Sequence, residues 1–280
     1  MIEFSCTQEF TKFRNTLNGT VGFIPTMGAL HDGHVSLIKK SLNTCDHTIV
    51  SIFVNPIQFA INEDLHSYPR PIEKDLKLLK NLNITAVFIP SHKDMYQKNH
   101  STFIEENDLT KNLEGTSRPH FFKGVLTIVT KLFNMTRPTH SFFGEKDAQQ
   151  LCVIKKLVVD LNFPINIIAC PTVRDENGLA LSSRNQYLED ETRKRASIIY
   201  LALMKAKHLV ESGEKNPHQI KKTINSLIST EPLATIDYIS IADSNSLEEI
   251  KKYINTNVLI SLAIYIRDIR LIDNISLFVD

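Results

Sequence analysis

Two histidines, His31 and His34, stand three residues apart in the stretch 25–34, which also carries two glycines. A short apolar run, 21–24, precedes the stretch and apolar residues at helical spacing follow it, so the pattern predicts a turn between a buried strand and a helix. In an open parallel sheet, anionic ligands are held at the carboxyl ends of strands, beside helix N-termini. The stretch therefore predicts a phosphate site that carries two imidazoles.

The chemistry of these imidazoles depends on their charge. The positive end of a helix dipole disfavours a protonated ring, so we expect either histidine to stay neutral and to donate an N–H to a phosphate oxygen. Negative charge that grows on this oxygen during a reaction would strengthen the hydrogen bond. Two alternatives stay open: a pair of metal ligands, or two surface histidines in a loop. A zinc site is disfavoured because no nearby Cys or His cluster supplies the remaining ligands.

Amide side chains follow the next apolar run, 48–54. Asn55 and Gln58 offer donors and acceptors to the hydroxyl, amine or carboxylate groups of a small polar substrate. The alternative is structural, because Asn-Pro commonly begins a turn.

Two later turns carry residue types that bind phosphate. The first, 144–147, follows an apolar strand pattern and holds Lys146, a point charge for a phosphate, with Gln150 one helical turn further on. The second holds Ser-Ser-Arg at 182–184, which provides two hydroxyls and a guanidinium fork. The structural alternatives are a solvated lysine and a helix N-cap at either serine.

Strand and helix patterns alternate along the first part of the chain. This rhythm favours the α/β class, with a Rossmann-like, doubly wound parallel sheet. We expect strands over 21–24, 48–54, 86–90, 141–143 and 165–170, a strand over 101–104 followed by a short helix, and helices over 5–18, 72–82 and 118–132.

The last part of the chain has a different pattern. After a turn at 175–178 we expect helices over 190–212 and 220–228 and strands over 236–241 and 258–266, with the chain closing on 269–274. The sequence thus predicts a nucleotide-binding domain over residues 1–174 and a smaller α+β domain over residues 175–280, which we expect to act as a lid.

Composition and charge exclude several classes of protein. Hydrophobic residues make up 42% of the chain and charged residues 22%, as in a soluble globular protein, and the formal net charge of +1 gives no field that attracts nucleic acid or an anionic membrane. The four cysteines are scattered without a C-x-x-C pair, which suits reduced thiols. No uncharged apolar run approaches membrane-spanning length. We therefore expect a cytoplasmic protein with no nucleic-acid or membrane partner.

Four motifs, found in the order 25–34, 53–59, 144–150 and 181–185, make nearly the whole chain resemble the pantothenate synthetases, which are ATP-dependent pantoate–β-alanine ligases. The resemblance implies a Rossmann-like N-terminal domain, a smaller C-terminal domain that closes over it, and a homodimer. It also implies that the carboxylate of pantoate attacks the α-phosphorus of ATP, giving pantoyl adenylate and pyrophosphate. The amine of β-alanine then attacks the acyl carbon and releases AMP, and Mg²⁺ accompanies the ATP.

The resemblance also implies roles for residues at the nucleotide. His34 is the proton donor at the departing pyrophosphate, His31 is its companion, and Lys146 attends the phosphates. The residues implied in ATP binding are Met27, Gly28, Ala29, Leu30, His31, Asp32, Gly33, His34, Gly144, Glu145, Lys146, Asp147, Val173, Leu181, Ser182, Ser183 and Arg184.

The other substrates are implied to meet the amides. Gln58, Gln150 and Asn55 hold pantoate, and Gln58 also meets β-alanine. The sequence assigns no metal ligand, although Asp64 and Asp75 are candidates.

Two segments depart from the family pattern. The family usually shows Arg-Pro-Gly-His-Phe where this chain has Arg-Pro-His-Phe-Phe at 118–122, so the histidine is displaced by one position and a ligand role there is open. The segment 59–62 lacks a glycine-proline pair that is common after the glutamine. We expect this loop to be arranged differently.

Three other functions compete with the ligase. A nucleotidyltransferase that only adenylylates a phosphorylated substrate would not depend on β-alanine, and the neutral amides of Gln58 and Gln150 favour a carboxylate substrate with hydroxyls instead. An RNA-binding or tRNA-charging module is disfavoured by the near-zero net charge and by the lack of an anticodon-type domain. The intact histidines and Lys146 argue against a non-catalytic nucleotide sensor.

Overall fold

The computed structural model describes residues 1–61 and 63–279, and the chain divides into two compact units. Unit 1 comprises Met1–Thr110, Glu114–Glu145 and Gln150–Pro171, and unit 2 comprises Lys111–Leu113, Lys146–Gln149 and Thr172–Asp280. The division into a nucleotide domain over residues 1–174 and a lid over residues 175–280 stays a prediction.

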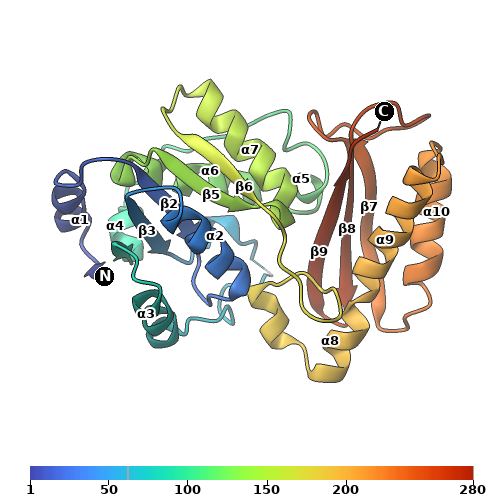
Figure 1. Ribbon diagram of the computed structural model, residues 1–280, viewed down its shortest axis with the longest axis horizontal. Helices are drawn as coiled ribbons and strands as arrows, with labels where there is room; N and C mark the ends of the chain where they lie inside the picture. The colour runs from blue at the N-terminus through green and yellow to red at the C-terminus, as the bar shows by residue number, and fades with distance from the viewer. Residues whose placement is uncertain (62, 280) are drawn as a thin grey trace. The chain divides into compact units, whose positions relative to one another are not determined.

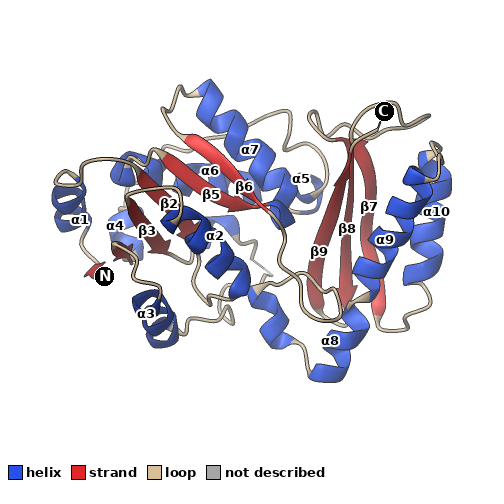
Figure 2. Ribbon diagram, in the orientation of Figure 1, coloured by secondary structure: helices blue, strands red, loops and turns tan. Residues whose placement is uncertain are grey.

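In the described residues, unit 1 is built on a six-stranded parallel sheet (Figure 1; Figure 2). Its strands are β1 (Ile2–Phe4), β2 (Val21–Thr26), β3 (His47–Ile52), β4 (Ala86–Phe88), β5 (His140–Gly144) and β6 (Asn166–Cys170). Their spatial order is β1-β4-β3-β2-β5-β6. Because the order reverses between β2 and β5, the sheet is doubly wound, and the expected Rossmann-like fold is confirmed.

Strand pairing is less extensive at this point of reversal. The register pairs Gly22 with His140 and Phe23 with Ser141, whereas β2 pairs with β3 over all six of its residues. Pro25 lies beyond the β2–β5 pairs, where its missing N–H costs no hydrogen bond to β5. Ligands of doubly wound sheets bind outside the carboxyl ends of the strands at such a point, so the end of β2 is well placed for a site.

Successive residues of the central strands point to opposite faces and fill two hydrophobic cores. Phe23 and Ile49 belong to one core, and their neighbours Ile24 and Val50 belong to the other. Side chains of α1, α6 and α7 complete the first core, and those of α2 and α3 complete the second. The helices are α1 (Thr7–Arg14), α2 (Asp32–Leu42), α3 (Ile72–Asn81), α4 (His92–Met95), α5 (Glu114–Ser117), α6 (Phe121–Thr136) and α7 (Ala148–Asp160).

Unit 2 has its own core between a small sheet and its helices. In the described residues, the sheet is antiparallel with the order β7-β8-β9, and α9 and α10 lie side by side along one of its faces (Figure 1). Ile220, Ile224 and Ile228 line one side of α10 at helical spacing and are fully buried. The elements are α8 (Asp190–Ala196), α9 (Ile198–Glu211), α10 (Pro217–Ile228), β7 (Ala234–Asp243), β8 (Val258–Ile266) and β9 (Ile269–Leu277). The expected α+β architecture is confirmed.

Some expectations about single elements are wrong. Residues 101–104 lie in a loop rather than a strand. The helix expected over 190–212 is divided into α8 and α9, which meet at Ser197. Strand β1 has only three residues, too few to leave a periodic signal in the sequence. Among the helices of residues 1–61 and 63–279, none has both the length and the apolar composition that a membrane span requires.

Candidate active site

The turn 27–34 begins where β2 ends, and its backbone needs support. Gly28 has φ +82° and Ala29 has φ 51°, both in the left-handed region. A Cβ on Gly28 would lie 3.1 Å from Asp75 Oδ2, which together with the φ angle favours glycine. The N–H groups of Ala29 and Leu30 donate to the two carboxylate oxygens of Asp75 at 2.8 and 2.9 Å. Asp75, from α3, therefore holds the turn in shape.

The two histidines stand at the start of α2, where backbone N–H groups orient their rings. His31 is the N-cap residue, and its Nδ1 accepts from the N–H of Gly33 at 3.1 Å. His34 Nδ1 accepts from the N–H of His31 at 3.3 Å, and the two ring centroids lie 4.1 Å apart. A ring nitrogen that accepts an N–H carries no proton, so each imidazole is neutral with its proton on Nε2. These hydrogen bonds leave Nε2 of each ring as the nitrogen that can donate.

The role of Asp75 differs from the one its position suggested. The sequence makes it a candidate metal ligand, but both of its oxygens accept backbone N–H groups. The residue is 1% exposed, and burial raises the pKa of its carboxyl more than the hydrogen bonds from Leu30 and Ala29 lower it. Across residues 1–61 and 63–279, no group of three or more His, Cys, Asp or Glu side chains is arranged to hold a metal ion.

Asn55 and Gln58 are buried beside this turn. Asn55 Nδ2 donates to Gln58 Oε1 at 3.2 Å and to the carbonyl oxygen of Gly124 at 3.0 Å. Gln58 ends the short helix η1 (Pro56–Gln58), and its Nε2 donates to Met27 Sδ at 3.1 Å. A Cβ on Gly124, in α6, would lie 2.6 Å from the backbone nitrogen of Gln58, so the close approach of α6 to η1 requires a glycine. The structure therefore brings the Gln58 amide against the turn that carries the histidines, with the Asn55 amide bonded to Gln58.

The segment that departs from the family pattern supports the same glutamine. Arg118 forms a double ion pair with Glu63, with both N–O distances at 2.6 Å, and donates to the carbonyl oxygen of Gln58 at 3.2 Å. The guanidinium lies 3.9 Å from the ring centroid of Phe121, the residue that replaces the family's histidine. Arg118 thus holds the backbone of Gln58, and Glu63 balances the charge of Arg118.

The second turn with a candidate phosphate ligand follows β5 and Gly144. It forms the short helix η2 (Glu145–Asp147), in which Lys146 Nζ lies 3.5 Å from Asp147 Oδ1. Asn274 Nδ2 donates to the backbone oxygen of Lys146 at 2.7 Å, within unit 2. Gln150 lies in the first turn of α7 and belongs to unit 1.

A tight hairpin precedes the third candidate segment. The N–H of Gly178 donates to the carbonyl oxygen of Asp175 at 3.0 Å, and Gly178 has φ +85°, so the predicted turn at 175–178 is confirmed. Arg174 and Ala180 form an antiparallel bridge across the turn. The Arg174 guanidinium also pairs with the buried carboxylate of Asp273 in β9, with Nη2 3.0 Å from Oδ1.

The hairpin leads directly into the serines. The N–H of Leu181 donates to the carbonyl oxygen of Val173 at 2.9 Å. Ser182 is the N-cap of the short helix η3 (Ser183–Tyr187), and its hydroxyl accepts from the N–H of Arg184 at 3.3 Å. The structural alternative for Ser182 is therefore confirmed, and this cap fixes the backbone that carries the Arg184 side chain.

Sequence reasoning missed the residues that hold the site together. These are Asp75 as a support of the turn, Gly124 as the point of close approach, and Tyr96, whose hydroxyl donates to Asn55 Oδ1 at 2.9 Å. Gly124 alone leaves a signal, a glycine inside an apolar helix pattern. The other two act on residues 41 or more positions away.

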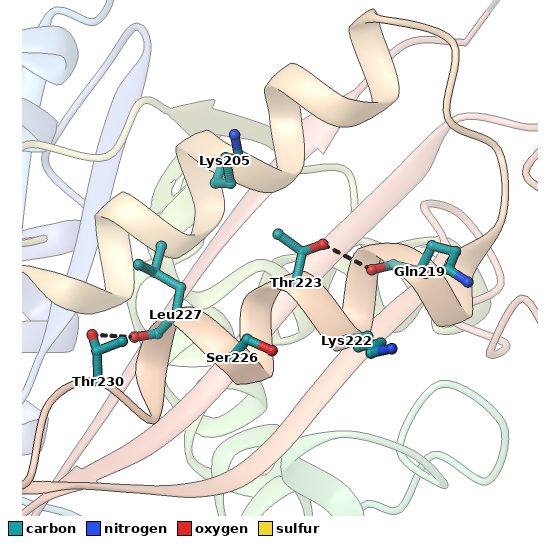
Figure 3. A pocket seen from close by; sticks show the side chains of 7 residues that line it. All are labelled: Lys205, Gln219, Lys222, Thr223, Ser226, Leu227 and Thr230. Carbon is teal, nitrogen blue, oxygen red and sulfur yellow. Dashed lines mark hydrogen bonds between the residues drawn. The ribbon is translucent and has the colours of Figure 1, made fainter.

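An open groove of about 540 Å³ on unit 2 contains none of the predicted site residues. It is lined from α9, α10 and the turn that follows by Lys205, Gln219, Lys222, Thr223, Ser226, Leu227 and Thr230 (Figure 3). The hydroxyls of Thr223 and Thr230 donate to carbonyl oxygens of their own segment, those of Gln219 and Leu227. These two hydroxyls are therefore already used within α10 and the turn that follows it.

Comparisons with known proteins agree with one another. The family model described as pantoate-beta-alanine ligase matches residues 3–276. A pantothenate synthetase of Carboxydothermus hydrogenoformans is 52% identical, covering 93% of this chain and 92% of that protein. The crystal structure of pantothenate synthetase from Thermus thermophilus has a TM-score of 0.93 at 37% identity, covering 98% of this chain and 99% of that one. A Francisella tularensis pantoate-beta-alanine ligase, crystallised with beta-gamma ATP and beta-alanine, has a TM-score of 0.81 at 38% identity, covering 98% and 97%.

Proposed function

Because this chain belongs to the pantoate-beta-alanine ligase family, we propose how its residues divide the work of joining pantoate to β-alanine. The enzyme is an ATP-dependent ligase that produces pantothenate. In the first of two proposed steps, a carboxylate oxygen of pantoate bonds to the α-phosphorus of ATP and pyrophosphate leaves. In the second, the amine of β-alanine bonds to the acyl carbon, loses a proton, and AMP leaves.

The observation that carries the proposal is the pair of neutral imidazoles at the start of α2. Their Nδ1 atoms accept backbone N–H groups, so Nε2 of His31 and of His34 is the donor. We assign His34 as the proton donor at the departing pyrophosphate and His31 as its companion. A donor fixed before the reaction stabilises charge that develops on the leaving oxygen without reorganising.

Other residues neutralise and position the triphosphate in this proposal. The backbone of the turn 27–30 approaches the nucleotide closely, while Lys146, Ser182, Ser183 and Arg184 attend its phosphates. Their charges reduce the repulsion between two anions, the carboxylate of pantoate and ATP, and holding both reactants together lowers the barrier further. The segments 31–34 and 144–147, together with Val173 and Leu181, supply the rest of the ATP site.

Pantoate recognition is assigned to the amides. Gln58, Asn55 and Gln150 hold pantoate, and Gln58 also meets β-alanine. The contact of Gln58 with Met27 supports this assignment, because it puts the amide beside the nucleotide turn.

Four further features complete the proposal. Mg²⁺ enters with ATP, whose phosphate oxygens provide ligands that this ion prefers. Residues 175–280 act as the lid domain, and the enzyme works as a homodimer, which light scattering of the purified protein tests. The cytoplasm is its compartment, in keeping with Cys6, Cys45, Cys152 and Cys170, which remain thiols.

Two alanine variants test the proposed roles. His34→Ala and Lys146→Ala should each lower pantoate-dependent ATP–pyrophosphate exchange by about a hundredfold or more, with the thermal unfolding curve unchanged. The matched controls are His47→Ala and Lys156→Ala, which remove the same side-chain types from positions outside the proposed site. Near-normal exchange in either test variant defeats the assignment of that residue. Pyrophosphate release with a dinucleotide product, independent of β-alanine, would indicate a nucleotidyltransferase instead.

A further inference from the structure

Tyr96 closes a buried chain of hydrogen bonds that ends at Gln58. The residue follows α4 and is 6% exposed, and its hydroxyl donates to Asn55 Oδ1 at 2.9 Å. Asn55, 1% exposed, donates through Nδ2 to Gln58 Oε1 and to the carbonyl oxygen of Gly124. All four residues belong to unit 1.

The direction of every bond in this chain follows from one carbonyl. The oxygen of Gly124 only accepts, so the Asn55 atom that faces it at 3.0 Å must be the NH₂ nitrogen. Asn55 Oδ1 is then left facing Tyr96, whose hydroxyl must donate. The second N–H of Asn55 points to Gln58, which must answer with its oxygen. Gln58 is therefore oriented with its NH₂ group outward from the chain, toward Met27.

Two further observations make this orientation rigid. The backbone of Gln58 touches α6 so closely that a Cβ on Gly124 would lie 2.7 Å from its Cα, so η1 has no room to shift toward the helix. Burial also raises the pKa of Tyr96 well above its usual range, so the hydroxyl keeps its proton and remains a donor at every working pH.

We propose that Tyr96 is a positioning residue: its hydroxyl holds the Asn55 amide in the orientation that leaves Gln58 a hydrogen-bond donor, and it thereby helps to select an oxygen acceptor of the substrate at this position. The inference rests on the proposed role of Gln58 in binding pantoate. A carboxylate or hydroxyl oxygen of pantoate satisfies the outward NH₂ group. The carboxylate of β-alanine satisfies it as well, whereas the ammonium group of β-alanine does not, which leaves that nitrogen to reach the acyl carbon.

The principal test removes one oxygen atom. Tyr96→Phe keeps the ring but leaves the buried Asn55 Oδ1 without its donor, so the Asn55 amide is held less firmly against Gln58. We expect the KM for pantoate to rise about tenfold, while the KM for ATP stays unchanged. Thr127→Val is the matched control, because it also removes a buried hydroxyl in unit 1, one that accepts from the N–H of Ile104 at 3.1 Å. It should change stability without changing the KM for pantoate.

A double-mutant cycle separates positioning from general damage. In a Gln58→Ala background, Tyr96→Phe should have no further effect on the KM for pantoate. If Gln58→Ala itself leaves this KM unchanged, the proposed function of Gln58 fails. If Gln58→Ala raises the KM but Tyr96→Phe does not, or raises it equally in both backgrounds, the role of Tyr96 alone is overturned.

A further variant tests the direction of the hydrogen bond even where Tyr96→Phe does not fold. Gln58→Glu replaces the outward donor by a carboxylate that only accepts at neutral pH. We expect a larger rise in the KM for pantoate than Gln58→Ala causes, because the new charge repels the substrate carboxylate. A KM below that of Gln58→Ala would show that Gln58 does not act as a donor to pantoate.

Discussion

The turn 27–34 and the segment 173–184 are both assigned to ATP, but different kinds of contact hold them in shape. The first depends on Asp75, a carboxylate from a helix more than forty residues away, which accepts its N–H groups directly. The second is held mainly by its own residues, through the hairpin at 175–178 and the N-cap of η3. Its distant supports include Asp273, which pairs with Arg174, and Arg193, which pairs with Asp175.

The difference lies in what the supporting carboxylate meets. Asp273 faces a guanidinium, so its charge is balanced. Asp75 faces two neutral N–H groups, so burial dominates and raises its pKa. The turn 27–34, with its neutral imidazoles, is thus supported by a buried carboxylate that has no cation as its partner. The segment 173–184, which carries cations, is supported by an ion pair.

Removal of the Asp273 carboxylate should have the largest effect. Asp273→Ala leaves the Arg174 guanidinium, whose side chain is 20% exposed, without its partner. Breaking a buried ion pair in this way costs about 3 kcal/mol, which a urea titration of unfolding measures. Glu211→Ala, which breaks the exposed pair with Lys207, is the control and should cost less than about 1 kcal/mol. Equal midpoints for the two variants would mean that Asp273 is not a support of the hairpin.

Loss of the Asp75 carboxylate should lower stability less than loss of the Asp273 carboxylate. It should also weaken the binding of ATP. Asp75→Ala leaves the N–H groups of Ala29 and Leu30 buried without acceptors, at a cost of about 2 kcal/mol. We expect the KM for ATP to rise more than the KM for pantoate, because the turn is altered while the amides are not. The control Asp46→Ala removes an exposed carboxylate that accepts from the N–H of Thr20, and the KM for ATP should not change in it. An unchanged KM in Asp75→Ala would show that the turn keeps its shape without this support.

The same comparison explains how far sequence reasoning reaches. The hairpin at 175–178 was predictable because Asp, Asn and Gly are residue types that turns favour. The turn at Gly28 was predictable because glycine favours turns as well. Apart from β1, the strands of the doubly wound sheet were predictable because buried parallel strands are continuous apolar runs. These features depend on neighbours in the sequence.

The supports of the site were not predictable because they join residues that only the fold brings together. Nothing near Asp75 distinguishes a carboxylate that accepts two N–H groups from a metal ligand. Tyr96 and Asn55 are 41 residues apart, and Tyr96 lies in a stretch with no strong period. Arg118 lies in a segment that departs from the family pattern, but its ion pair with Glu63 joins residues 55 positions apart.

The smallest expected effect is on the pH dependence of stability, and it has opposite signs in the two units. The folded-state pKa of Asp75 is raised, so its contribution to stability is complete below the unfolded value, near 3.8, and is lost as pH rises through the folded value. Asp243, at the end of β7, accepts from the N–H groups of Ser246 and Asn245, which lower its pKa. Its contribution is present above the unfolded pKa and is lost as pH falls through the folded one.

Replacing each carboxylate by an amide isolates its contribution to the change of stability with pH. When the free energy of unfolding is measured between about pH 3 and pH 7, the advantage of the wild type over Asp75→Asn should shrink as pH rises, and its advantage over Asp243→Asn should grow. The signs differ because desolvation outweighs two N–H bonds at the buried carboxyl of Asp75 and is outweighed by them at the half-buried carboxyl of Asp243. Slopes of the same sign would mean that Asp75 is hydrated in the folded protein. The turn 27–34 would then be supported in the same way as the exposed turn at 243–246.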